Sequence, residues 1–412
     1  MVNTIPRGRL AQNTLLSLFW QGMRVLFLAV WIIGLARLLG AEGYGTYSGI
    51  AGIAIALGSF SGLGLGLLLY QDAVIDPELF DQRWSDALWT TILSGALFAV
   101  IFLAIGFFVF PDISMLTLVA VGITELVFYP MMTTSAFAFA SRHKIGWSSA
   151  VPALAAFFRC ISIALFALSG AQREIDSYVW FHLFATATSS VMVVLLVNGV
   201  LKPEPRPYNI KTENLRKGLR FCLSWASTNA LTSADKTLVL KIGGGEMAGL
   251  YSSSFRFASI FMLPIDALVN AATPKLFLQG AKKHDSSPVI KYVFIALVAY
   301  SVVAGCALIT LPEFIIWMLG PSFAAAEQAI KWLSLLIPCY AMRVFSTQIL
   351  LTSGHVRIKV IAEFGGLCLL LLLGFLLIPA YGLFGAALML IATEAVVALI
   401  CWFAITKNSY LK

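Results

Sequence analysis

Long apolar runs separated by short polar stretches extend along almost the whole chain. From Leu15 onward, windows of about 20 mostly apolar residues follow one another, interrupted by proline, glycine and clusters of charge. A helix needs about 20 such residues to cross a hydrocarbon layer about 30 Å thick. Membrane-crossing strands would instead alternate apolar and polar residues, and this alternation is absent from the sequence. The pattern predicts an all-α integral membrane protein.

The apolar runs predict about twelve transmembrane helices in two six-helix bundles. The first bundle is predicted within residues 1–200 and the second within residues 218–412. A polar segment at residues 201–217, in which prolines alternate with charges, is predicted to be a cytoplasmic linker. The predicted spans are 13–38, 44–70, 87–110, 113–140, 149–170, 176–199, 218–242, 247–278, 290–311, 323–352, 356–378 and 382–406.

The charged residues are few, 12% of the chain, and their distribution predicts the orientation. Most lysines and arginines fall in loops on one side, whereas little beyond Arg37, Arg173 and Lys241 falls on the other. Basic loops face the cytoplasm. We therefore expect a multi-pass protein with both termini in the cytoplasm. The net charge of +8 does not indicate nucleic-acid binding, because no loop is long enough to form a nucleic-acid module.

Motifs for metal, nucleotide or redox chemistry are missing from the sequence. The six cysteines lie in apolar runs without a C-x-x-C pair, and the four histidines form no H-E-x-x-H motif. No G-x-x-x-x-G-K-[ST] loop occurs. We expect no cofactor and no enzymatic activity. Ion gradients, the membrane potential or a substrate gradient would then supply the energy.

An internal repeat is the most informative pattern. The nine residues from Gly40 to Ser48 match those from Gly244 to Ser252 as G-x-E-x-x-G-x-Y-S, and each copy follows the first predicted span of its half. An even number of spans in each half gives the two copies the same orientation. The repeat therefore predicts a pseudo-two-fold axis along the membrane normal, which is one known way of building a transporter.

These two turns, together with the Asp235-Lys236 pair, resemble the polysaccharide transporter branch of the multidrug/oligosaccharidyl-lipid/polysaccharide exporter superfamily, the Wzx-type O-antigen flippases. The resemblance implies a V-shaped, MATE-like pair of six-helix bundles around a central cavity. The first, second, seventh and eighth helices would line this cavity, which would open to each side of the membrane in turn.

The resemblance also implies a function. The expected substrate is an undecaprenyl-pyrophosphate-linked oligosaccharide, such as a repeat unit of O-antigen (lipopolysaccharide), capsule or exopolysaccharide. The protein would move it from the inner to the outer leaflet of the bacterial inner membrane. Expected partners are this polyprenyl-pyrophosphate-linked oligosaccharide, membrane lipids, and polymerase or chain-length proteins of the same pathway. The alternatives are an ion-coupled drug or cation antiporter, a lipid II flippase, and a membrane glycosyltransferase or ligase. The last would need a larger extracytoplasmic loop than the sequence contains.

Basic residues inside predicted spans are candidates for substrate binding, because a charge in hydrocarbon costs about 2.5 kcal/mol or more and normally faces a partner or water. Arg24 and Arg256 lead, since guanidinium matches phosphate with two parallel hydrogen bonds. Both lie on helices that the resemblance places at the cavity. Arg159 and Lys236 follow, and for these the alternative is a structural ion pair with Glu125 and with the adjacent Asp235.

Five acidic residues in predicted spans are candidates for ion coupling through H⁺ or Na⁺. A carboxylate in a medium of low dielectric constant can change its charge near neutral pH. Satisfied hydrogen bonding between helices is the alternative for each. The residues are Asp235, Asp266, Glu125, Glu363 and Glu394, with the first two ranked highest.

Glycines and prolines inside the apolar runs predict close packing or bends. Gly58, Gly62 and Gly66 form G-x-x-x-G-x-x-x-G in the second span, where no strand precedes them as a dinucleotide site would require. Four prolines lie within predicted spans, and each would remove one backbone donor: Pro130, Pro152, Pro264 and Pro338. We expect the helices to be interrupted or bent at these places.

Overall fold

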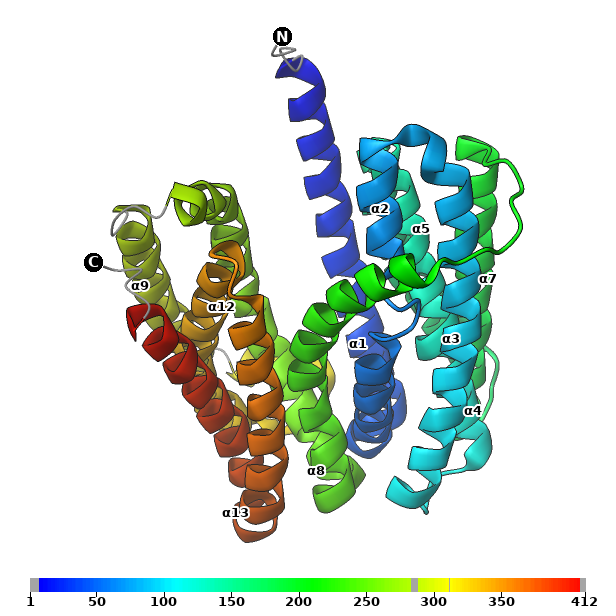
Figure 1. The fold of residues 1–412 in the computed structure, drawn as a ribbon. Helices are drawn as coiled ribbons and strands as arrows, with labels where there is room; N and C mark the ends of the chain where they lie inside the picture. Colours follow the sequence, from blue (N-terminus) through cyan, green and yellow to red (C-terminus); the bar gives the residue numbers. More distant parts are fainter. Residues whose placement is uncertain (1–6, 283–287, 311, 408–412) are drawn as a thin grey trace. The chain divides into compact units, whose positions relative to one another are not determined.

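Every regular element in the described part of the chain is helical (Figure 1). The computed structural model describes residues 7–282, 288–310 and 312–407. The elements are α1 (Arg7–Gly58), α2 (Leu65–Ile75), η1 (Pro77–Leu79), α3 (Phe80–Val109), α4 (Met115–Ile123), the π-helical turn η2 (Thr124–Phe128), α5 (Tyr129–Ser141), α6 (Ile145–Leu168), α7 (Ile175–Leu201), α8 (Thr212–Lys282), α9 (Pro288–Thr310), α10 (Pro312–Leu319), η3 (Pro321–Phe323), α11 (Ala326–Leu333), α12 (Leu336–Thr352) and α13 (Val356–Lys407).

Within the described ranges, eight helices are long and apolar enough to cross a membrane, and a ninth candidate is formed by α11 and α12, which meet at a bend of 43°. Three of the eight, α1, α8 and α13, contain 52, 71 and 52 residues, more than twice the length that one crossing needs. Each has one residue outside helical geometry, at Gly40, Gly244 and Gly382. Counting α1, α8 and α13 as two spans each, and the α11–α12 pair as one span, gives the twelve spans that the sequence predicts.

The two copies of the repeat have the same backbone conformation at their first residue. Gly40 has φ 68° and ψ −173°, and Gly244 has φ 79° and ψ 177°. A positive φ is strained for residues with a Cβ atom and unstrained for glycine. The shared glycine therefore produces the same break between two helical stretches in both copies.

The repeat copies also pack against each other through backbone atoms. A Cβ atom on Gly45 would collide with the backbone of Gly245 and Gly249, and a Cβ atom on Gly249 would collide with the backbone of Ala41. In the alignment of the repeat, Gly45 corresponds to Gly249 and Ala41 to Gly245. The contacts are therefore reciprocal, as expected for two helices related by a local two-fold axis.

Contacts divide the chain into two compact units. Unit 1 contains the chain before Gly40 together with Ile53–Ala226, and unit 2 contains Gly40–Gly52 together with the chain from Ser227 onward. The first half of the chain thus contributes one short stretch, with the first repeat copy, to unit 2. This division groups residues by contact and does not count spans, so the six-helix bundles at residues 1–200 and 218–412 stay a prediction.

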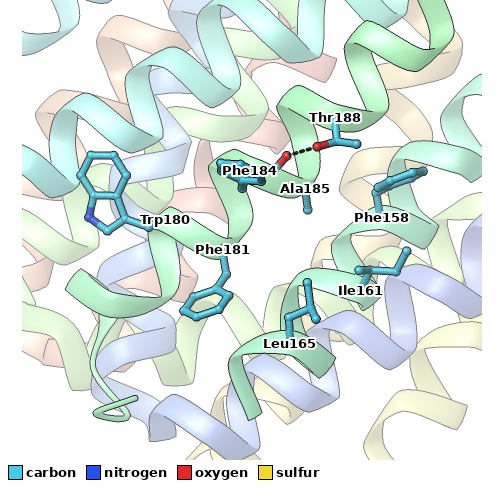
Figure 2. A pocket seen from close by; sticks show the side chains of 8 residues that line it. All are labelled: Phe158, Ile161, Leu165, Trp180, Phe181, Phe184, Ala185 and Thr188. Carbon is cyan, nitrogen blue, oxygen red and sulfur yellow. Dashed lines mark hydrogen bonds between the residues drawn. The ribbon is translucent and has the colours of Figure 1, made fainter. Parts of the chain in front are cut away.

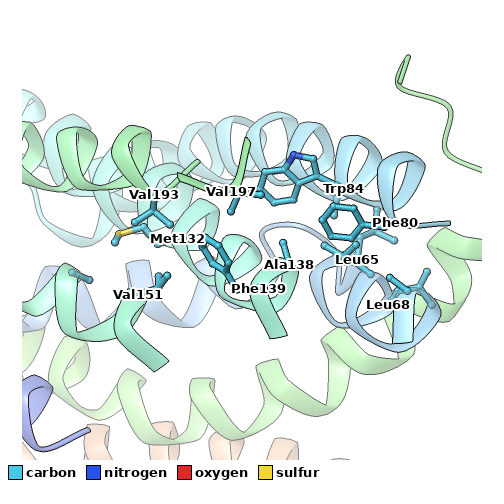
Figure 3. Packing of buried hydrophobic residues seen from close by; sticks show 14 residues of the cluster. Leu65, Leu68, Phe80, Trp84, Met132, Ala138, Phe139, Val151, Val193 and Val197 are labelled. Carbon is cyan, nitrogen blue, oxygen red and sulfur yellow. The ribbon is translucent and has the colours of Figure 1, made fainter. Parts of the chain in front are cut away.

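Unit 1 is held together by an apolar cluster in which α2, α3, α5, α6 and α7 meet (Figure 3). Phe80 and Phe139 are completely buried in it, and Trp84 is almost completely buried. In a membrane, dispersion contacts and close fit stabilise such a cluster, because lipid tails are as apolar as the side chains themselves. The members labelled in the figure are Leu65, Leu68, Phe80, Trp84, Met132, Ala138, Phe139, Val151, Val193 and Val197.

The predicted linker is shorter than expected and is bound to α3. Helix α7 ends at Leu201 and α8 begins at Thr212, so the last six predicted linker residues are helical. The Asn209 amide donates to Asp86 at 2.9 Å, and Ser85 donates to the Arg206 carbonyl at 2.7 Å. Polar side chains on α3 thus bind a segment that its composition predicted to be a linker.

Two further irregularities coincide with predicted bends, whereas α6 continues through Pro152 and α8 through Pro264 without a residue outside helical geometry. Helix α1 ends at Gly58, and residues 59–64 form turns in which Gly62 and Gly64 have positive φ, so the glycine motif interrupts the second span. The π-helical turn η2 lies directly before Pro130, and Ser190 donates a hydrogen bond of 2.9 Å to the Phe128 carbonyl. The π-turn rearranges the backbone bonds ahead of a residue that lacks an N–H group.

Candidate functional site

Unit 1 contains a buried charged cluster centred on Glu125. This carboxylate lies in η2 and is only 3% exposed. The Arg159 guanidinium of α6 lies 3.2 Å from it, and His182 Nε2 of α7 lies 3.7 Å from the same oxygen. The Arg159 guanidinium also lies over the rings of Trp31, at 5.0 Å, and Tyr129, at 5.2 Å. Aromatic faces and a carboxylate together stabilise this cation away from water.

A tyrosine extends this cluster to α1. Trp31 Nε1 donates a hydrogen bond of 2.7 Å to the Tyr178 hydroxyl, which lies 3.5 Å from His182 Nδ1 and 3.4 Å from the Ser162 hydroxyl. The His182 ring thus lies between the hydroxyl of Tyr178 and the carboxylate of Glu125. The sequence placed His182 alone in a helix. Its i, i+4 spacing from Tyr178 was the available signal, because such residues share one helix face.

Unit 2 contains a second buried cluster around Arg343 of α12, which is 2% exposed. Its guanidinium bonds to Glu394 and lies 3.8 Å from Glu363, both on α13. Lys359 Nζ lies 3.6 Å from Glu363, which also accepts a hydrogen bond of 2.6 Å from Ser227. Two cations thus face two carboxylates. The sequence named the two carboxylates as candidates for ion coupling, and the positive groups bound to them were not predicted.

The candidates Asp235 and Lys236 form an ion pair with 2.9 Å between Nζ and Oδ1. The Tyr251 hydroxyl donates to the other oxygen of Asp235 at 2.7 Å, and Lys236 Nζ lies 4.1 Å from the centre of the Phe255 ring. Asp235 is completely buried. Both alternative readings from the sequence, Arg159 with Glu125 and Lys236 with Asp235, therefore exist as contacts.

Asp266 is the candidate carboxylate that no basic residue pairs with in the described ranges. It is half-buried and accepts hydrogen bonds of 3.0 and 3.2 Å from the Tyr340 hydroxyl. The hydroxyl donates hydrogen bonds to this carboxylate but supplies no positive charge. Asp266 differs in this respect from the other four acidic candidates.

Arg24 and Arg256 differ from the remaining basic candidates in the same way. Both side chains are half-buried, and neither forms an ion pair with a described carboxylate. On α1, about two helix turns before Arg24, the Ser17 hydroxyl lies 2.9 Å from the Ser149 hydroxyl of α6. Arg256 lies close enough to Lys236 for their positive charges to act on each other. These two guanidiniums remain available for an anion.

An apolar groove of about 460 Å³ lies between α6 and α7 of unit 1 (Figure 2). Its single hydroxyl, on Thr188, donates to the Phe184 carbonyl at 2.8 Å. A sugar needs partners for its hydroxyl groups, so this groove is unsuited to an oligosaccharide. The lining residues are Phe158, Ile161, Leu165, Trp180, Phe181, Phe184, Ala185 and Thr188.

Residues 10–277 match the family model described as "Polysaccharide biosynthesis protein". The chain belongs to this family. No curated protein sequence matches the chain. The family match confirms the resemblance inferred from the two repeat turns, since it covers both of them.

Solved structures confirm the predicted fold of this chain. An inward-facing multidrug resistance MATE transporter of the MOP superfamily aligns with a TM-score of 0.74 and 12% identity over 94% of this chain and 96% of that chain. The lipid II flippase MurJ in an inward closed conformation aligns with a TM-score of 0.70 and 13% identity over 96% and 87%. A MOP superfamily transporter from Pyrococcus furiosus, described as having a binding pocket of reverse polarity, aligns with 0.64 and 13% over 97% and 94%. At 12 to 13% identity, these likenesses show that the chain has the all-helical, MATE-like membrane fold.

Proposed function

We propose that this protein is a transporter, a flippase for polyprenyl-pyrophosphate-linked oligosaccharides. It would move them from the inner to the outer leaflet of the bacterial inner membrane by alternating access. The family description names polysaccharide biosynthesis, and one solved relative is a lipid II flippase. Each sugar hydroxyl costs about 4 to 8 kcal/mol to move unpaired into alkane, so unaided flipping is too slow to be useful. O-antigen, capsule and exopolysaccharide repeat units share this requirement, and polymerase or chain-length proteins would receive the product.

The contrast between paired and unpaired cations carries the proposal. Arg159, Lys236 and Arg343 each have a carboxylate partner, whereas Arg24 and Arg256 have none among the described residues. A guanidinium stays charged at any accessible pH and needs an anion or water inside a membrane. A pyrophosphate offers it negative charge and pairs of acceptor oxygens that match the two parallel N–H groups of the guanidinium, which suits bidentate binding.

The acidic candidates divide in a similar way for ion coupling. Glu125, Glu363, Glu394 and Asp235 each form an ion pair within the described part of the protein, whereas Asp266 forms none there and accepts hydrogen bonds from Tyr340. Asp266 is therefore the position at which we expect H⁺ or Na⁺ to bind. The four paired carboxylates would take part only if their own cations moved away.

A drug or cation antiporter is the alternative, favoured by the alignment with a multidrug transporter. Its cationic substrate would be repelled by Arg24 and Arg256. A lipid II flippase fits the same arginines, because lipid II also carries a pyrophosphate. The sugar attached to the carrier distinguishes these two flippases, and no described residue identifies that sugar.

The test is transport by arginine variants in cells whose own flippase has been deleted. Arg24→Ala and Arg256→Ala should each abolish delivery of the oligosaccharide to the outer surface, so that lipid-linked repeat units accumulate inside. Lysine at either position should restore part of the activity, since it keeps the charge without the fork. Arg173→Ala, at an exposed arginine between α6 and α7, is the control and should transport normally. Full transport by the Arg24→Ala, Arg256→Ala double variant would refute the proposal.

A further inference from the structure

The first turns of α8 carry an exposed stripe of alternating basic and apolar side chains. Arg216, Leu219, Arg220 and Leu223 are all exposed, Leu219 by 37% and Leu223 by 45%. Their spacing of i, i+3, i+4 and i+7 places them on one face of the helix. We call these four residues the α8 stripe.

The opposite face of this segment is fixed against unit 1. Asn214 accepts a hydrogen bond of 3.2 Å from Arg83, and the Cys222 thiol lies 3.5 Å from the Ser59 carbonyl. Between them, a Cβ atom on Gly218 would lie 2.6 Å from the Leu63 carbonyl oxygen, so the two backbones touch. Asn214, Gly218 and Cys222 recur every four residues, and packing of this face holds the α8 stripe outward.

The segment before the helix fixes its direction as well. The Tyr208 hydroxyl lies 3.3 Å from the Thr90 hydroxyl, and Gln82 donates to the Pro207 carbonyl at 3.0 Å. Together with the bond from Asn209 to Asp86, these contacts bind the connection to α3 over two helical turns. The α8 stripe is thus a preformed surface of unit 1.

Nearby acidic residues leave the two arginines of the stripe unpaired. Glu213 forms an ion pair of 2.7 Å with Lys217, and Glu204 forms one of 2.7 Å with Arg206. No described carboxylate lies within ion-pair distance of Arg216 or Arg220. Like charges four residues apart on a helix repel each other, so an anion between them would stabilise the segment.

The stripe lies where the sequence predicts the cytoplasmic end of a membrane span. Leucine side chains exposed at this level contact hydrocarbon, and arginine side chains extend their charged ends toward the headgroups. The cytoplasmic leaflet of a membrane carries anionic lipids, which attract basic residues next to a span. We infer that the α8 stripe binds an anionic phospholipid of the cytoplasmic leaflet, with Arg216 and Arg220 on its phosphate and Leu219 and Leu223 along its acyl chain. The inference does not rest on the proposed substrate.

Native mass spectrometry of the full chain in detergent can test this binding, with phosphatidylglycerol and phosphatidylcholine of identical acyl chains as probes. The wild type should bind phosphatidylglycerol more tightly. Because each basic residue near an anionic headgroup contributes about fivefold, Arg216→Gln with Arg220→Gln should weaken phosphatidylglycerol binding by about 30-fold and leave phosphatidylcholine binding unchanged. Arg216→Lys with Arg220→Lys should retain most of the preference.

Two controls distinguish the stripe from total charge and from the transport substrate. Arg173→Gln with Lys241→Gln removes two exposed basic residues predicted on the outer side and should keep the preference. Farnesyl pyrophosphate, a short prenyl pyrophosphate, should displace phosphatidylglycerol no better than an equal concentration of unlabelled phosphatidylglycerol. Equal binding of the two phospholipids by the wild type, or an unchanged preference in the glutamine variant, would overturn the inference. Preferential displacement by farnesyl pyrophosphate would assign the stripe to the lipid carrier instead.

Discussion

At the scale of single residues, almost every deeply buried charge has an opposite charge within reach. Arg343 is the largest side chain that is almost fully enclosed, and it contacts two carboxylates from a neighbouring helix. A buried pair gains little over a well-packed apolar substitute, whereas removing one partner leaves an uncompensated charge. The contacts of Arg343 are therefore expected to determine stability more than transport.

Arg343→Met should lower the free energy of unfolding by about 3 to 5 kcal/mol, because Glu394 and Glu363 would then face each other with Lys359 alone. Adding Glu394→Gln should recover part of the loss. Denaturation of the purified protein in mild detergent measures both. Lys331→Met, which breaks the exposed pair of Lys331 with Glu327, is the control and should cost less than about 1 kcal/mol. A loss in Arg343→Met no larger than in this control would contradict the expectation.

At the scale of elements, glycine sets where helices break and where they touch. Gly40, Gly244 and Gly382 each interrupt a helix with positive φ, so the polypeptide continues in a new direction without a loop. Gly45 and Gly249 act differently, since they are helical and let two backbones approach. The repeat predicted a turn between two spans in each half, and only the structure shows that the two copies contact each other.

Gly45→Ala should destabilise the protein by about 1 to 3 kcal/mol, because the new Cβ atom meets backbone that cannot rotate away. The reciprocal contact predicts a similar loss for Gly249→Ala. Gly365→Ala is the matched control within a span, since a Cβ atom there meets nothing within 4 Å, and it should be neutral or stabilising by up to about 1 kcal/mol. Thermal unfolding in detergent compares the three variants. Unequal effects of the two repeat positions would argue against a symmetric crossing.

At the scale of the whole molecule, the charge of the loops predicts the orientation in the membrane. Basic residues concentrate at the start of α1, between α7 and α8, and at the end of α13, and the predicted even number of spans places these segments on one side. The proposed flippase and the proposed lipid contact both require this side to be the cytoplasm.

Reporter fusions should show both termini and the segment at residues 202–211 inside the cell. A phosphatase fused after Lys412 should be inactive, since this enzyme folds only outside the cytoplasm, and a fluorescent protein at the same place should be bright. A fusion in the turn at residues 170–174, between α6 and α7, should give the reverse result. An active phosphatase at the C-terminus would contradict an even number of spans.

The membrane class, the span positions, the breaks and the repeat were determined by the sequence alone. Each depends on residues close together in the chain: about 20 apolar residues make a span, and a glycine permits a positive φ whatever surrounds it. The ion pairs Arg159 with Glu125 and Lys236 with Asp235 were foreseen as alternatives, because few opposite charges exist in the apolar runs. Only the tertiary structure showed which candidates have no ion-pair partner within residues 7–282, 288–310 and 312–407, namely Arg24, Arg256 and Asp266.

Tertiary structure alone also decided the contacts that join distant parts of the chain. Arg343 meets Glu394 across 51 residues, and Trp31 meets Tyr178 across 147. The polar segment after α7 lies along α3 because Asp86 and Ser85 offer partners 123 and 121 residues away. Hydropathy predicts which segments are long and apolar enough to cross the bilayer. It does not record which helices are neighbours, because every apolar face is equally compatible with lipid and with another helix.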